Sequence, residues 1–475
     1  MNILIISTNR NRLPMPVMPV GACMVAEAAE RAGHSVRMLD LMFERDALAA
    51  LQAAVVSGRP DVVGLSVRNI DNNDMRAPMF FLEDLPKLVA AIRSLTDARI
   101  VLGGASLGVM PEDMLRFSGA DCAVMGDGEV VFPLLLERLS AKRTYGDLPG
   151  VISRENNGYR KTACGISGPF NDVIAPDFQK WLNVSAYRSQ LSTVPVQTKI
   201  GCQFQCVYCT YRKIEGSAYR LGDPGSVADA VERLSAAGLR DIEFVDSVFN
   251  APLDHALDLC RALSTRKHNA RLQSLELNPL HVNDELLDAM THAGFVGIGI
   301  TAESASDQVL RGLRKGFTTR EVHAAADAVR RHKLPCAWIF LMGGPGETRE
   351  TVRETLRFAE QQVRKSDVVF MNIGIRIYPG TELEAIARKQ GLLTVSPAAM
   401  LTPVFYVSPD VSAAWIRQEI QQAMERNMNF INTDSIGLSI LPAIHRIASK
   451  FGVRPPLWKH TRFIRRGLRM IGMRV

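Results

Sequence analysis

Short apolar runs alternate with helical patterns along most of this chain, and this alternation limits its fold more than any other feature. Consecutive strands of a parallel sheet need a crossover helix between them, and burial on both faces makes each strand almost continuously apolar. The pattern therefore predicts an α/β protein built from strand–helix units. It occurs twice, over 1–145 and over 191–395, so we expect two such domains.

The first domain, 1–145, has five strand-like runs with helical patterns between them. Five such units predict a doubly wound (Rossmann-like) domain, and the ligand of such a domain binds beyond the carboxyl ends of the strands. The predicted strands begin at Asn2, Ser35, Asp61, Ala98 and Asp121.

The second set of units, 191–395, has six strand-like runs and predicts a partial (β/α)6 barrel. Weaker periodicity over 146–190 indicates a connector between the two domains. The strand–helix rhythm stops near residue 396, so we expect a mostly helical carboxyl-terminal region over 396–475. The predicted barrel strands begin at Val194, Asp241, Gln273, Gly294, Cys336 and Val368.

The sequence carries no sign of export or of membrane insertion. It begins without a basic segment followed by a long apolar run, and no stretch approaches the roughly 18 apolar residues of a spanning helix. Five of the eight cysteines are scattered singly, which suits a reducing compartment without disulfides. We therefore expect a cytoplasmic protein.

The net charge of +7 is concentrated near the carboxyl terminus, because nine lysines and arginines and no acidic residue follow Asp434. The rest of the chain is close to neutral, so we expect no nucleic-acid partner. Residues 457–472 predict a basic amphipathic helix, which either covers the barrel or makes peripheral contact with an anionic membrane surface. Membrane contact would make a lipid-like substrate plausible. The apolar face of this helix would hold Leu457, Ile464, Leu468 and Ile471.

Three of the eight cysteines lie together in GCQFQCVYCTY (201–211), as Cys202, Cys206 and Cys209. A structural zinc site takes four ligands, and no histidine lies near this segment. A [4Fe–4S] cluster normally takes one thiolate per iron, so three cysteines would leave one iron open to a substrate. The segment follows the first predicted barrel strand, at the end where barrels place their chemistry. The spacing predicts a metal-binding iron–sulfur site; the alternative is a zinc- and RNA-binding protein.

The Cys-x3-Cys-x2-Cys spacing, with Tyr208 before the last cysteine, resembles the signature of radical S-adenosylmethionine (SAM) enzymes. The resemblance extends over residues 194 to about 390, and five matches in the right order are far more specific than one. The other four matching segments are FVDSVF (from Phe244), GITAESASDQVLRGLRKG (from Gly299), FLMGGPGET (from Phe340) and YPGTEL (from Tyr378).

The resemblance implies that the three thiolates hold a [4Fe–4S] cluster and that SAM binds its open iron. An electron from a donor such as a flavodoxin or ferredoxin would then cleave SAM to a 5′-deoxyadenosyl radical. Glu303 has an alternative role as a barrel carboxylate paired with a base such as Arg311. Asn278 stands where many relatives carry an arginine, so the SAM carboxylate would need another partner. The residues implied to contact SAM are Tyr208, Asp246, Glu303, Ser304 and Gly343.

The first domain resembles the cobalamin-dependent (B12-binding) branch of the radical SAM enzyme family. The matching segments are PVGACMVAEAAERAGHSVRMLDL (from Pro19), DVVGLS, VLGG and MGDGE. Glycines at strand ends let the backbone approach a large ring and its nucleotide tail closely. The residues implied to bind cobalamin are Gly21, Ser66, Gly103, Gly104, Gly126, Gly128 and Glu129.

Many cobalamin proteins place a histidine below the cobalt through Asp-x-His-x-x-Gly, and this chain lacks that motif. Arg68 follows the third predicted strand, at the end where the ligand should lie. Its guanidinium has no lone pair for a metal, so below the corrin it would exclude water without binding cobalt. The alternative is that Arg68 caps the strand or pairs with Asp71 or Asp74.

Together these resemblances imply a cobalamin-dependent radical SAM methyltransferase. The 5′-deoxyadenosyl radical would take hydrogen from an unactivated carbon, and methylcobalamin would deliver the methyl group. The alternative is a ring-forming or rearranging enzyme with the same cofactors and no methyl transfer. A methylthiotransferase is excluded because that class needs three cysteines in its first domain, where this chain has only Cys23 and Cys122.

Overall fold

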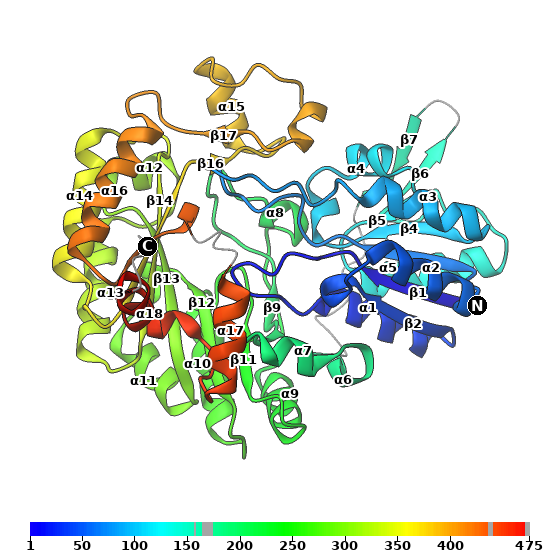
Figure 1. Cartoon of the computed structure of the whole chain (residues 1–475), viewed down its shortest axis with the longest axis horizontal. Helices are drawn as coiled ribbons and strands as arrows, with labels where there is room; N and C mark the ends of the chain where they lie inside the picture. Colours follow the sequence, from blue (N-terminus) through cyan, green and yellow to red (C-terminus); the bar gives the residue numbers. More distant parts are fainter. Residues whose placement is uncertain (156–157, 164–173, 436–439, 471–475) are drawn as a thin grey trace.

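The computed structural model describes residues 1–155, 158–163, 174–435 and 440–470. Two α/β domains lie side by side, with the amino-terminal domain at one end of the long axis and the barrel at the other (Figure 1). The carboxyl-terminal helix α17 (Leu441–Lys450) packs on α7 (Val184–Ser189), and α18 (Thr461–Met470) lies on the barrel (Figure 1). The predicted fold class is therefore confirmed.

The first sheet has seven strands in the order β2-β1-β3-β4-β5-β6-β7. Its first five strands are parallel and are the five that the sequence predicts. The chain crosses from one side of β1 to the other between β2 and β3, and ligands bind at such a switch point in doubly wound sheets. These strands are β1 (Asn2–Ser7), β2 (Ser35–Asp40), β3 (Val62–Ser66), β4 (Arg99–Gly103) and β5 (Cys122–Val124). The helices of this domain are α1 (Val20–Arg31), α2 (Ala47–Gly58), α3 (Leu85–Leu95), α4 (Pro111–Ser118) and α5 (Gly128–Ser140), with the short helices η1 (Leu41–Phe43) and η2 (Ala105–Gly108).

The segment predicted as a connector instead extends the first sheet. β6 (Val151–Glu155) and β7 (Gly158–Lys161) add to it as an antiparallel pair at its edge. Most of their residues are exposed, so they lack the continuous apolar run by which the other strands are recognised. Two short helices follow, α6 (Phe178–Trp181) and α7 (Val184–Ser189).

The second sheet is the partial barrel, with strands in the order β18-β15-β14-β13-β12-β11-β8. All neighbouring strands are parallel, and six of them are the predicted ones. The strands are β8 (Val194–Val196), β11 (Asp241–Phe244), β12 (Arg271–Leu277), β13 (Phe295–Glu303), β14 (Cys336–Met342), β15 (Val368–Ile373) and β18 (Phe430–Asn432). The surrounding helices are α9 (Pro224–Ala236), α10 (Leu253–Ser264), α11 (Asp284–His292), α12 (Asp307–Gly312), α13 (Thr319–Arg331), α14 (Arg349–Gln362), α15 (Glu382–Lys389) and α16 (Ala413–Arg426).

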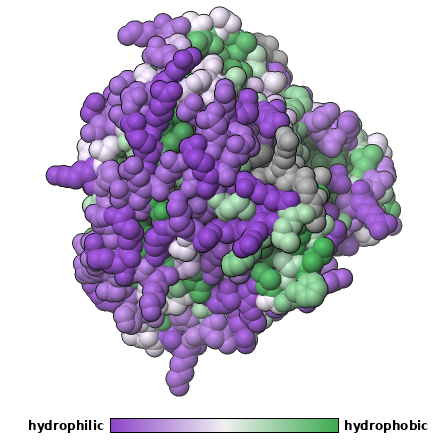
Figure 2. Space-filling model, turned by 60° about the vertical axis from the view of Figure 1, so that its left-hand side comes forward, coloured by the Kyte–Doolittle hydropathy of each residue, from purple (hydrophilic) through white to green (hydrophobic). Residues whose placement is uncertain are grey.

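The region expected to be mostly helical contributes the seventh barrel strand. β18 pairs with β15 in parallel, although only two consecutive apolar residues, Phe430 and Ile431, stand there between asparagines, so the sequence shows no apolar run. Two short antiparallel pairs complete the domain, and the outer barrel face is mostly hydrophilic (Figure 2). The remaining elements are α8 (Tyr211–Ile214), β9 (Lys199–Ile200), β10 (Arg220–Leu221), β16 (Ile375–Arg376), β17 (Phe405–Tyr406), η3 (Pro279–His281), η4 (Ala398–Leu401), η5 (Thr433–Ser435) and η6 (Leu457–His460).

The tail packs on the barrel where the strands begin. Lys459 donates to the carbonyl of Val296 at the start of β13, and buried Arg465 donates to the carbonyl of Phe430 at the start of β18. Ile464 and Leu468 of α18 are half-buried, so the predicted apolar face points to the barrel; Ile471 lies outside the described residues. None of the helices in the described ranges has the length and apolar character needed to cross a membrane.

Candidate functional site

The three predicted cluster ligands lie on one tight loop after β9. Gly201 begins this loop at φ +98°, and a Cβ there would lie 2.1 Å from the carbonyl oxygen of Ala218, so only glycine fits. The Cys202 amide donates to the carbonyl of Gly216, and the Cys209 amide donates to that of Cys206. These backbone contacts help to hold the thiols near one another.

The chemistry of these thiols fits a metal cluster. Burial, with smaller contributions from Cys206 and Cys202, raises the pKa of Cys209 to about 12, so the thiols lie close enough to interact. Thiols in such surroundings need a metal cation to become thiolates. Within the described ranges no three His, Cys, Asp or Glu side chains converge on a place for a single ion. A [4Fe–4S] cluster binds each thiolate at a separate iron, so Cys202, Cys206 and Cys209 fit it.

A buried network lies beside the cysteine loop. The Tyr208 hydroxyl donates to Glu303 Oε1 at 2.8 Å, and Lys315 Nζ lies 3.3 Å from the same oxygen and 3.3 Å from the Tyr208 hydroxyl. Glu303 ends β13 at φ +62°, a conformation that costs a non-glycine residue energy and is typical of functional sites. Its ionic partner is Lys315 rather than Arg311. Lys315 was not predicted, although it lies in the matching segment.

Two of the side chains predicted to contact SAM form hydrogen bonds with other residues of the protein. Both carboxylate oxygens of Asp246 accept hydrogen bonds from Thr198 and Lys199, directly before the cysteine loop. The Ser304 hydroxyl bonds to the Thr355 hydroxyl and accepts the amide of Ser306. The structure gives Asp246 and Ser304 a positioning role, and their contact with SAM stays a prediction.

The other two positions noted for SAM are also fixed by local contacts. Gly343 has φ +93°, which favours glycine, and its amide donates to Glu347 at 3.0 Å. The Asn278 side chain accepts the amide of Leu280, and its backbone exchanges hydrogen bonds with the Asn250 side chain. Asn278 therefore shapes the end of β12.

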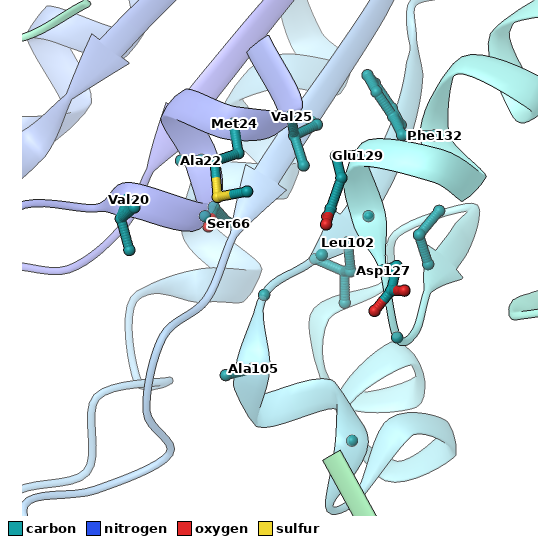
Figure 3. Close-up of a pocket in the computed structure, with 18 of the residues that line it drawn as sticks. Val20, Ala22, Met24, Val25, Ser66, Leu102, Ala105, Asp127, Glu129 and Phe132 are labelled. Atoms are coloured by element: carbon teal, nitrogen blue, oxygen red, sulfur yellow. The ribbon is translucent and has the colours of Figure 1, made fainter. Parts of the chain in front are cut away.

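Seven of the predicted cobalamin residues line one cavity of about 240 Å³ at the carboxyl ends of the first sheet. A Cβ at Gly21 or Gly103 would meet nothing within 4 Å, so both glycines leave open space, whereas Gly104 has φ +102° and packs on the Val67 carbonyl. Glu129 at the start of α5 lies opposite α1 (Figure 3). The predicted residues in the lining are Gly21, Ser66, Gly103, Gly104, Gly126, Gly128 and Glu129.

The residues of this cavity fit a corrinoid in part. Pockets for drug-sized ligands measure about 300–1,000 Å³, so this cavity would hold a portion of cobalamin such as its nucleotide tail. Residues of the barrel complete the lining. The sequence did not predict this, because each domain was recognised from its own motifs. The barrel residues in the lining are Gln197, Ile200, Ile214 and Glu215.

Arg68 lies outside that lining and projects from the end of β3. Its side chain is exposed, yet enough protein surrounds it that desolvation lowers the pKa of its guanidinium, while Tyr211 and Glu243 of the barrel oppose this shift. Among the described residues Arg68 forms no hydrogen bond or ion pair. The alternative pairing is not found, because Asp71 binds Arg376. Arg68 therefore faces the barrel, and its place below cobalt stays a prediction.

The barrel also carries two carboxylates that the sequence analysis did not single out. Glu243 accepts hydrogen bonds from Thr193 and Gln273. Glu276 lies near the end of β12; its side chain reaches solvent, yet the protein around it desolvates the carboxyl and, with the neighbouring Glu303, raises its pKa to about 8. Such a carboxyl is protonated near neutral pH and can donate a hydrogen bond.

Two family models match the chain in the order that the sequence predicts. The B12 binding domain model matches residues 7–136, and the Radical SAM superfamily model matches residues 196–359. The first range contains the glycine-lined cavity, and the second begins just before the cysteine loop.

Several similar proteins are methyltransferases. An uncharacterized methyltransferase, PH0819 of Pyrococcus horikoshii, is 26% identical over 79% of each chain, and the tryptophan 2-C-methyltransferase of Streptomyces laurentii is 24% identical over 78% of this chain and 72% of its own. The methyltransferase TsrM of Kitasatospora setae, solved with cobalamin and a [4Fe–4S] cluster, has the same fold, with a TM-score of 0.85 at 22% identity over 99% of both chains. From its two family models and this fold, the chain belongs to the radical SAM enzymes that carry an amino-terminal B12-binding domain.

Proposed function

We propose that this chain is a cobalamin-dependent radical SAM methyltransferase that methylates an unactivated carbon of a small molecule. The observation that carries the proposal is that the cysteine loop and the glycine-lined cavity adjoin. Ile214, at the end of the helix after the cysteines, packs on Gly108 of the first domain and lines the cavity. A radical centre and a methyl carrier must lie close together for one substrate to meet both.

The residues of the chain would position the cofactors. When bound, the cluster and SAM supply a 5′-deoxyadenosyl radical and cobalamin supplies the methyl group. Cys202, Cys206 and Cys209 would hold the cluster. Lys315 neutralises Glu303 and fixes the Tyr208 ring beside it, so this network would form one wall of the SAM site.

The substrate would enter the barrel from the side of the first domain. Glu276 lies near Glu303 at the carboxyl ends of the strands, and we assign it to contact with the substrate. This favours a small molecule with a polar group. We further propose a cytoplasmic enzyme that a flavodoxin or ferredoxin reduces, because the reducing cytoplasm preserves the thiols.

The test uses protein that is purified and reconstituted with iron and sulfide without oxygen. It is supplied with cobalamin, SAM, a reductant and fractionated extract from its host as the source of substrate. Methyl transfer yields S-adenosylhomocysteine, and radical formation yields 5′-deoxyadenosine. Both products together support the proposal. 5′-Deoxyadenosine alone supports the ring-forming alternative, and bound zinc with neither product supports the zinc- and RNA-binding alternative.

We also propose that the tail contacts an anionic membrane surface peripherally. The three most exposed large apolar side chains of the described residues all lie there: Phe451 (82% exposed), Met470 (81%) and Phe463 (77%). Exposed Arg462 and Arg466 flank Phe463. Because α18 covers the starts of the barrel strands, this surface lies at the end away from the cysteine loop. Membrane contact would thus place the enzyme at the membrane without delivering substrate to the site, and it does not favour a lipid-like substrate.

A further inference from the structure

Glu215 connects the two cofactor sites. It follows α8, and its Oε2 accepts the amide of Gly201 at 3.1 Å, the residue directly before Cys202. The other oxygen, Oε1, lies 3.4 Å from Nε2 of Gln197. Glu215 and Gln197 also line the cavity of the first domain. One carboxylate therefore holds the backbone of the cysteine loop and forms part of the cobalamin cavity.

The surrounding contacts leave the cysteine loop little freedom to move independently of the first domain. A Cβ on Gly108 would lie 2.8 Å from Ile214, so η2 and α8 pack without a gap. Arg220 forms a two-pronged ion pair with Asp127, in the turn directly before the cavity residues Gly128 and Glu129. Both ends of the segment from Ile214 to Arg220 are thus fastened to the first domain.

The same segment encloses the start of the cysteine loop. The carbonyl of Gly216 accepts the Cys202 amide, and the carbonyl of Ala218 lies against Gly201, where no side chain fits. A carboxylate accepts hydrogen bonds, and cobalamin offers amide and hydroxyl donors. A ligand that orders Glu215 in the cavity would therefore order the Gly201–Cys202 backbone as well.

We propose that Glu215 is a positioning residue that couples cobalamin binding to cluster binding. Each cofactor favours the same position of Glu215, so each raises the affinity for the other by an equal factor. The inference rests on the proposed function, since it needs both cofactors to bind.

The test is a titration with hydroxocobalamin, followed by absorbance without oxygen, of iron-free and cluster-loaded protein. We compare the wild type with Glu215→Ala, Glu215→Gln and the control Glu129→Gln, which alters the same cavity from the first domain. The ratio of the two dissociation constants measures the coupling. We expect a ratio of about 5 or more in the wild type, the lower end of typical couplings. It should fall near 1 in Glu215→Ala and stay at the wild-type value in Glu129→Gln.

Glu215→Gln keeps an oxygen that can accept the Gly201 amide, so its ratio should lie between those of the wild type and the alanine variant. The electron paramagnetic resonance spectrum of the reduced cluster gives a second readout. It should change on cobalamin addition in the wild type and not in Glu215→Ala. A wild-type ratio near 1, or an undiminished ratio in Glu215→Ala, overturns the inference. Failure of every form to bind cobalamin overturns the proposed function itself.

Discussion

Arg376 of β16 donates a hydrogen bond from Nε to Asp71 Oδ2 at 2.8 Å, and both side chains are buried where the two domains meet. The same guanidinium donates to the carbonyls of Ile377 and Met400. Asp71 belongs to the loop after β3 that carries Arg68. The ion pair therefore fixes this loop of the cobalamin domain on the barrel.

Breaking this pair should destabilise the protein strongly. Asp71→Asn leaves the Arg376 charge buried without its anion, and such a change costs about 3–5 kcal/mol. The control is Asp84→Asn, which breaks an exposed pair with Lys87 and should cost less than about 1 kcal/mol. Urea unfolding followed by tryptophan fluorescence measures both. Equal midpoints for the two variants would contradict the structural role of Asp71.

Removal of the three loop thiols should abolish the cluster. Replacing Cys202, Cys206 and Cys209 together by alanine removes every protein ligand, so we expect no bound iron, no broad absorbance near about 400 nm and no SAM cleavage. Cys23→Ala and Cys260→Ala are the controls, because these thiols are buried in the core and should leave the iron content unchanged. Iron assay after reconstitution distinguishes the variants, and iron at wild-type content in the triple variant would refute the site.

Most of the strands that the sequence predicted have a continuous apolar run, and the missed strands do not. All eleven predicted strands are present, and in most of them burial on both faces leaves a continuous apolar run, although β2 at the sheet edge has no buried residue. β7 lies at a sheet edge and is largely exposed, and β18 has only two consecutive apolar residues, so neither shows a readable apolar run. Their places are set by pairing with distant strands.

The sequence predicted those site residues that belong to a motif within one segment. It missed those whose role depends on contacts between distant segments. The cysteines and the cavity glycines are each local in sequence. Glu215 takes its role from Gly201 and from the opposite domain, and Lys315 from Glu303 and Tyr208. Such roles depend on tertiary contacts, and no spacing in one segment encodes them.

Stability should depend on the protonation of Glu347. Its side chain is fully buried, accepts the Gly343 amide and the Thr351 hydroxyl, and has a pKa raised by burial to about 7. The pKa of a glutamate in the unfolded chain is about 4.3, so the folded state binds the proton more tightly. Stability is therefore lost as pH rises through 7.

Glu347→Gln removes this dependence. Between pH 5 and pH 8 the wild type should lose about 2–3 kcal/mol relative to the variant, as judged by urea unfolding at both pH values. Glu350→Gln is the control, because Glu350 is exposed and Arg357 lowers its pKa, away from this range. A constant difference between wild type and Glu347→Gln across the range would show that Glu347 does not titrate there.

The tail should bind anionic vesicles through exposed residues of α18. We expect full-length protein to float with phosphatidylserine vesicles at low salt and to be released as salt rises, since each basic residue contributes about 1 kcal/mol. Arg462→Glu with Arg466→Glu should abolish flotation, and Phe463→Ser should weaken it. Both leave buried Arg465 intact. Flotation of the charge-reversed variant, or of protein truncated after Pro455, at the wild-type extent would exclude this surface.

The last prediction concerns Arg68 and the lower face of the cobalt. Arg68 is exposed, has no partner among the described residues and faces the barrel beyond the end of β3, where the ligand of such a domain binds. A guanidinium offers no lone pair to a metal, whereas a neutral imidazole does. If Arg68 lies below cobalt, Arg68→His should add a nitrogen ligand there.

Electron paramagnetic resonance of the Co(II) form measures this directly, because one coordinated nitrogen splits each line into three. We expect the splitting in Arg68→His and not in the wild type. Arg76→His, an exposed arginine of the same loop, is the control and should show none. The variant should also release its methyl group less readily as a radical, since a lower ligand strengthens the hold on it. Splitting in both Arg68→His and wild type, or in neither, would place Arg68 elsewhere.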